Sequence, residues 1–142
     1  MSNCTQLGES DLATLQRSIA PVMNPAVFAY CTFADFKLPA GLQPICTFRE
    51  SEGLTAVVQR EDALRLGIGH QFESRLITLS VHSALHAVGF IARVATALAA
   101  AGIACNAVSA FHHDHLFVPV EQADSALRVL EQLARADAGE LV

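Results

Sequence analysis

The chain has 142 residues, of which 52% are hydrophobic and 16% are charged, and its formal net charge at pH 7 is −5. A chain this apolar can bury enough surface to fold, which excludes disorder as its main state, and its length favours one domain or two small ones sharing a core. The acidic balance, the absence of Trp and the single Tyr argue against nucleic-acid binding, which needs cationic and base-stacking side chains.

The first half of the chain predicts the order α-β-β-β-α. Leu12, Leu15 and Ile19 recur at helical spacing, and Pro21 and Pro25 are expected to break the chain after this helix. The expected elements, in chain order, are a helix over 9–19, a strand over 27–33, a loop over 36–44, a hairpin of strands 45–49 and 54–58, and a short helix over 61–66 that ends at Gly67.

The second half predicts the order β-α-β-β-α. Residues 76–82 alternate between apolar and polar, which is typical of a half-buried strand. From Val88 to Ala101 the apolar residues recur every three or four positions, as in a helix, and Gly102 is a suitable left-handed residue to end it. The remaining expected elements are a strand over 103–111, a tight turn at 112–114, a strand over 116–120 and a closing helix over 122–136.

These orders predict an α+β fold of two ferredoxin-like units, whose antiparallel sheets are covered by helices on one face. We place the boundary near residues 67–72, with an N-terminal unit over 1–69 and a C-terminal unit over 70–142. The second unit lacks an obvious final strand and the first lacks an obvious opening strand. A strand exchanged between the halves would supply the missing strand of each unit.

The four cysteines, Cys4, Cys31, Cys46 and Cys105, are too far apart for a CxxC metal or redox site. The start of the chain has no basic cluster and no apolar stretch of the signal-peptide type, and the longest apolar run, 97–105, is far shorter than the roughly 20 residues that span a bilayer. We therefore expect a cytoplasmic protein with reduced thiols and no membrane partner.

Residues 89–103 resemble the signature of the ACT domain family. Gly89, Val94, Leu98, Gly102 and Ile103 fall in register with the family's helix pattern, and the strand before and the hairpin after also fit. The resemblance implies ACT-like βαββαβ units, divergent in the N-terminal half and clear in the C-terminal half. It also implies a non-catalytic regulatory protein, similar to small bacterial tandem-ACT proteins, that binds an amino acid or another small carboxylated metabolite.

The same resemblance implies a ligand site at the loop before this helix. The corresponding residues are His82, His86, Ala87, Val88, Gly89 and Phe90. The family's aspartate falls on His86 and its proline on Val88, so a carboxylate that could bind an ammonium group is missing there. Gly89 either lets a ligand approach the unpaired amides of the helix start or merely allows the turn, and the two histidines fit a polar surface loop equally well. In the family the ligand lies at an interface between two ACT units, so it would bind between the two units of this chain or across a dimer. We expect a homodimer because the sheet of such folds leaves edge strands that pairing would cover.

The run of His112, His113, Asp114 and His115 offers an alternative function. Imidazoles and a carboxylate are common metal ligands, so the run could serve a metal-binding protein or a small metal-dependent enzyme. A polar hairpin turn with Asp114 at its tip explains the same residues without a metal. We expect no catalytic residues and no cofactor, since no nucleophile motif is present. A ligand-free protein-interaction module is a third hypothesis.

Overall fold

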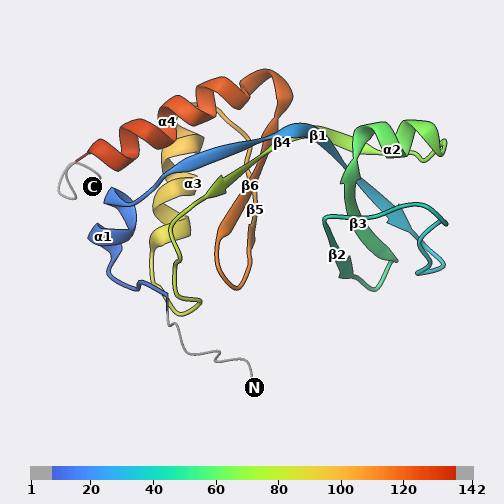
Figure 1. Cartoon of the computed structure of the whole chain (residues 1–142), viewed down its shortest axis with the longest axis horizontal. Coiled ribbons are helices and arrows are strands. Elements are labelled where there is room, and N and C mark those ends of the chain that lie inside the picture. The colour runs from blue at the N-terminus through green and yellow to red at the C-terminus, as the bar shows by residue number, and fades with distance from the viewer. Residues whose placement is uncertain (1–7, 137–142) are drawn as a thin grey trace.

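The computed structural model describes residues 8–136. Its elements, in chain order, are α1 (Leu12–Arg17), β1 (Pro21–Phe33), β2 (Cys46–Arg49), β3 (Leu54–Gln59), α2 (Arg60–Arg65), β4 (Gln71–Leu79), α3 (Phe90–Ala100), β5 (Asn106–Ser109), β6 (Asp114–Pro119), the 3-10 turn η1 (Val120–Gln122) and α4 (Ala123–Arg135). Helices α1, α3 and α4 lie at one end of the molecule and α2 at the other, and the long strands β1 and β4 run between them (Figure 1).

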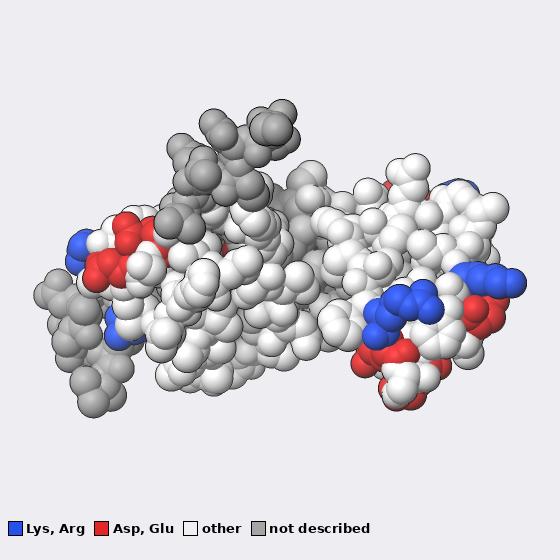
Figure 2. Space-filling model, turned by 90° about the horizontal axis from the view of Figure 1, so that it is seen from below, with Lys and Arg blue, Asp and Glu red and all other residues white. Residues whose placement is uncertain are grey.

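The surface of the described residues is unevenly charged. On the face in Figure 2, charged side chains gather toward the two ends, and the middle carries none. No helix within residues 8–136 is long and apolar enough to cross a membrane. Cys31, Cys46 and Cys105 are free thiols, and Cys4 lies outside the described residues.

All six strands form one antiparallel sheet in the order β2-β3-β1-β4-β6-β5. Strands β1 and β4 each belong to two overlapping four-stranded groups of the sheet. The start of β1 (21–23) pairs with the end of β4 (77–79) and completes the group β1-β4-β6-β5, whereas residues 27–30 pair with 71–75 and complete the group β2-β3-β1-β4. Each group has the strand order of a ferredoxin-like unit, so the α+β fold class is confirmed and the expected exchange takes the form of two shared strands.

Two expectations for the first half were wrong. Its opening strand is present as β1, and what it lacks is a helix between β1 and β2, where the chain forms a loop over 34–45. Pro21 and Pro25 do not break the chain but lie within β1. Pro21 is the first residue of the strand, and Pro25 lies where the pairing register shifts between Met23 and Val27, two places where a missing N–H is tolerated.

A large core fills the space between the sheet and helices α1, α3 and α4. Ile77 and Leu79 of β4 are fully buried in it, as the alternation predicted, and so are Val94 and Leu98 of α3. The closing helix expected over 122–136 is confirmed as α4, and its Ala126, Leu130 and Leu133 are buried in this core. Val88 was wrongly assigned to the helix: α3 begins at Phe90, and Val88 is 84% exposed.

The buried side chain of Gln16 joins the three helices that cover this core. Gln16 of α1 is 1% exposed. Its Nε2 donates to the carbonyl oxygens of Leu133, at 2.9 Å, and Ala136, at 3.0 Å, at the end of α4. Its Oε1 accepts from the guanidinium of Arg93 of α3 at 2.7 Å. Gln16 thus gives the Leu133 carbonyl, which also accepts from the Ala136 N–H at 3.3 Å, a second donor, and it pairs the carbonyl of Ala136, the C-cap residue of α4.

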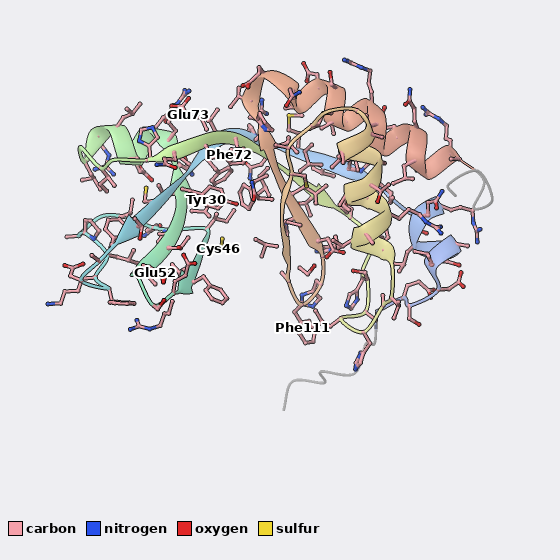
Figure 3. The ribbon with its side chains drawn as sticks, turned by 180° about the vertical axis from the view of Figure 1, so that it is seen from behind. Tyr30, Cys46, Glu52, Phe72, Glu73 and Phe111 are labelled. Carbon is pink, nitrogen blue, oxygen red and sulfur yellow. The ribbon has the colours of Figure 1, made fainter. Side chains whose placement is uncertain are left out.

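On the other side of the sheet lies a second cluster made of strand residues alone, which we call the open face. Its buried members are Phe28, Val57, Leu76 and Phe117. The Phe117 ring meets Phe28 and Tyr30 edge to face, with centroids 6.0 and 5.7 Å apart. Tyr30 also meets Phe72, at 5.8 Å, and Figure 3 shows these two rings side by side between the two ends of the molecule.

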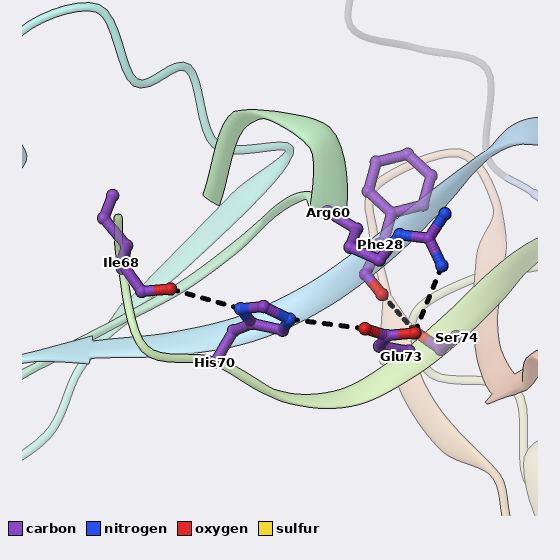
Figure 4. A network of polar contacts seen from close by, with 6 residues as sticks. All are labelled: Phe28, Arg60, Ile68, His70, Glu73 and Ser74. Atoms are coloured by element: carbon purple, nitrogen blue, oxygen red, sulfur yellow. Dashed lines mark hydrogen bonds and ion pairs between the residues drawn. The ribbon is translucent and has the colours of Figure 1, made fainter. Parts of the chain in front are cut away.

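Helix α2 covers the same face of the sheet as the other helices. Glu73 of β4 has the strand parity of Ile77 and Leu79, and it pairs with Arg60, the first residue of α2, at 3.2 Å (Figure 4). The hydrogen bonds from Arg60 and then His70 hold the pKa of Glu73 below its usual value. The helices therefore share one face, as expected, and the open face lies opposite.

Candidate functional site

A cavity of about 210 Å³ opens at the start of α3. It lies between the loop that follows β4, the first turn of α3 and the β5–β6 hairpin. Its lining residues are Ser83, Ala84, Leu85, Ala87, Gly89, Phe90, Ile91, Ala92, Ser109, Ala110 and Asp114. We call it the loop cavity.

The helix start that faces this cavity is uncapped. Gly89 is the N-cap residue of α3, with φ +91° and ψ −5°, and no side chain caps the helix. The first turn contains no acidic residue. The amide N–H groups of a first turn have no partner within the helix and carry the positive end of its dipole, so they favour an anion in the loop cavity.

A carboxylate lines the opposite side of the same cavity. Asp114 is 3% exposed and accepts hydrogen bonds from the hydroxyl groups of Ser83, at 2.8 Å, and Ser109, at 2.6 Å. Each carboxylate oxygen keeps a further lone pair, so the group can accept more donors. The expectation that Asp114 forms the hairpin tip was wrong: the Ala110 N–H donates to the His113 carbonyl at 3.0 Å, and β6 begins at Asp114.

The N-terminal segment of the described chain fixes the loop. The Glu9 N–H donates to the His82 carbonyl at 2.8 Å, and the Ala84 N–H donates to the Glu9 carbonyl at 2.8 Å. Gly8 lies so close that a Cβ there would be 2.6 Å from the Ala84 nitrogen, a contact that only glycine allows. Ser83 is therefore held where its hydroxyl reaches Asp114.

The residues predicted from the family resemblance divide into two sets. Ala87, Gly89 and Phe90 line the loop cavity, whereas His82, His86 and Val88 are not among its lining residues. The His82 ring lies against that of His112, with centroids 5.2 Å apart, and His86 and Val88 are exposed.

Sequence reasoning missed Ser83, Ser109 and Asp114. A signal for Asp114 was present in the strand alternation. Asp114 precedes Leu116 and Val118 at two-residue spacing, which places all three on the helix-covered face of β6.

The histidine run does not converge on a metal site. Asp114 faces the loop cavity, and the next residue, His115, faces the other side, where its Nδ1 lies 2.9 Å from the Thr78 hydroxyl. Among the residues that the structure describes, no group of three His, Cys, Asp or Glu side chains could hold a metal ion. Burial, and then the nearby His113, lower the pKa of His115, and Asp114 opposes them.

Two family models described as ACT domain match the chain, one over residues 7–75 and the other over residues 71–132. A solved structure from Vibrio cholerae is 40% identical and covers 87% of this chain and 95% of its own, with a TM-score of 0.76. Its description is a protein of unknown function and possible transport protein.

More distant structures share the fold. A protein from Agrobacterium tumefaciens is 20% identical and covers 76% of this chain and 81% of its own, with a TM-score of 0.61. The regulatory subunit of aspartate kinase from Thermus thermophilus is 12% identical and covers 82% and 97%, also with a TM-score of 0.61. A search of curated proteins finds no match to the chain.

Proposed function

Because the chain belongs to the ACT domain family, we propose that it is a non-catalytic regulatory protein whose loop cavity binds a free amino acid. The family supports the coarser statement, a regulatory role that involves binding a small molecule. The finer statement, that the ligand is an amino acid, rests on the chemistry of the loop cavity.

The observation that carries the proposal is a pair of opposite charge preferences in one small cavity. The first-turn amides of α3 favour a carboxylate, and the carboxylate of Asp114 favours an ammonium group. A free amino acid carries both groups on one carbon. Asp114, from β6, thus supplies the negative charge that the loop lacks at His86.

The rest of the loop cavity restricts the ligand side chain. Asp114 is the one charged residue among the described lining residues, and most of the others are apolar. Burying a second charge there without a partner would be costly. We therefore propose an amino acid with an uncharged side chain.

The mouth of the loop cavity supports a homodimer. Leu85, which lines the cavity, is 64% exposed, and Val88, on the same loop but outside the lining, is 84% exposed. A second copy that covered them would enclose the ligand, and ligand binding would then shift the assembly equilibrium. Sedimentation velocity with and without the amino acid measures this shift.

The first experiment is a thermal-shift screen of the purified protein against the common amino acids. A ligand at 100 times its Kd adds about 2.7 kcal/mol of stability, or about 10 °C for a chain of this size. Asp114→Asn should abolish the shift, whereas Asp124→Asn, which removes the same charge at an exposed position of α4, should preserve it.

A second pair of variants separates loss of binding from loss of folding. Ala92 is an exposed residue in the first turn of α3 beside the loop cavity, and Ala99 is also exposed, near the other end of the helix. Ala92→Glu places an anion where the ligand carboxylate would bind, although an acidic residue in a first turn stabilises a helix. Ala92→Glu should therefore abolish binding in a folded protein and Ala99→Glu should not. If no amino acid stabilises the wild type, the proposal is wrong and an interaction module remains.

A further inference from the structure

A second cavity, of about 310 Å³, lies on the open face. Ile45 and Cys46 contribute one wall, and Val108 and Ala110 contribute another. These residues belong to, or directly adjoin, β2 and β5, which are the two edges of the sheet. The sheet therefore curves until its edges line a single cavity, which we call the sheet cavity.

The floor of the sheet cavity is apolar and rigidly supported. Leu76 and Phe117 line it, and their exposed fractions are 3% and 2%. Phe117 is held by its edge-to-face contacts with Phe28 and Tyr30. Such pairs fix ring orientations, so the floor is formed before any ligand arrives.

Three polar side chains, Asn24, Thr78 and His115, also line the sheet cavity. The hydrogen bond between the Thr78 hydroxyl and His115 Nδ1, 2.9 Å long, fixes the imidazole ring. Burial lowers the pKa of His115, which favours the neutral form of the ring. None of the described lining residues carries a formal charge at neutral pH, in contrast to the loop cavity with Asp114.

The two cavities lie on opposite sides of the β5–β6 hairpin. Ser109 and Asp114 line the loop cavity, whereas Val108 and His115, their neighbours in sequence, line the sheet cavity. Ala110, directly after β5, lines both cavities. The cavities thus differ in position and in charge.

We propose that the sheet cavity is a second binding site, for an uncharged and largely apolar small molecule that carries one hydrogen-bonding group. Its volume is in the range of small-molecule sites, and its apolar floor with a few convergent polar groups is their usual composition. A charged ligand would lose its hydration without gaining a counter-charge. This site is independent of the function proposed for the loop cavity.

Indole is a suitable probe because it is neutral, mostly apolar and carries one N–H. The chain contains no Trp, so indole emission reports on the probe alone. Titration of the full chain into indole should give a saturable rise in fluorescence anisotropy. Val108→Asp places a carboxylate in the cavity wall and should weaken binding about tenfold or more.

Ala107→Asp is the matched control. Ala107 precedes Val108 on β5, is exposed and faces the other side of the strand, so this variant should bind indole like the wild type. Thr78→Val is a second variant of nearly unchanged shape that removes the hydroxyl partner of His115, and it should also weaken binding. In NMR spectra, indole should shift the amide signals of Val108 and His115 but not that of Gly89.

The proposal is wrong if indole shows no saturable binding, or if Ala107→Asp weakens binding as much as Val108→Asp does. If indole does not bind and Val108→Asp dissociates a dimer in sedimentation velocity, the open face is an interface between two copies of the chain instead.

Discussion

The buried amide of Gln16 allows a quantitative prediction about stability. Leu is close to Gln in size, so Gln16→Leu removes three hydrogen bonds without opening a large cavity. Two of the lost bonds join neutral groups, worth about 1 kcal/mol each, and the third joins the Arg93 guanidinium, worth about 1.5–3 kcal/mol. Arg93 is half-buried and recovers part of its hydration. We expect a loss of about 2–4 kcal/mol in the free energy of unfolding.

Urea denaturation followed by circular dichroism measures this loss as a lower midpoint with an unchanged slope. Gln16→Glu tests the reasoning further. It keeps an acceptor for Arg93 and adds a charge attraction, but it removes both donors and directs a carboxylate at the carbonyl end of α4, where the helix dipole is negative. It should therefore be destabilising at neutral pH.

Gln132→Leu, at an exposed position of α4, should change stability by less than about 0.5 kcal/mol. A Gln16→Leu protein within about 1 kcal/mol of the wild type, or a Gln16→Glu protein as stable as the wild type, would refute the capping argument.

Two further predictions concern glycine and pH. Gly89→Ala and Gly102→Ala each place a Cβ at a positive φ, +91° and +72°, so each should lower the free energy of unfolding in urea by about 1–2 kcal/mol. In a thermal-shift assay, Gly89→Ala alone should weaken amino-acid binding. Equal weakening by both variants would contradict the placement of the ligand. The pKa of His115 is lower in the folded chain than its ordinary 6.5, so the unfolded chain binds the proton more tightly; stability should be highest above about pH 6.5 and fall as the pH drops below it. Urea midpoints measured across that range should vary less in His115→Gln, and an unchanged pH dependence would show that other groups cause it.

Local patterns predicted the local structure well. Periodicity and turn residues predicted the positions of α3, α4 and the hairpin of β2 and β3, because these elements depend on residues that are close together in the sequence. Pro21 and Pro25 misled the prediction, since whether a proline ends a strand or lies in a bulge depends on the partner strand. The partner of this part of β1 is β4, which lies about fifty residues away in the sequence, and no local signal identifies it.

The candidate site was predicted only at the helix signature and in the loop directly before it, where Ala87 lines the loop cavity. Gly89 and Phe90 belong to that signature and do line the loop cavity. Asp114 reaches the cavity from a different strand, and Ser83 is positioned by a bridge between Glu9 and the loop. Sequence adjacency to three histidines suggested a turn or a metal site for Asp114, whereas its role depends on which side of β6 faces the helices.

The sharing of β1 and β4 has a consequence for the autonomy of the two units. Cutting the chain between residues 69 and 70 would leave the C-terminal part without the strand residues 21–23 and without α1, and the N-terminal part without the strand residues 71–75. Neither fragment could complete its sheet. During synthesis, we expect the sheet of the first unit to stay incomplete until β4 has been made. We therefore expect the two units to fold and unfold together as one cooperative unit rather than as independent modules.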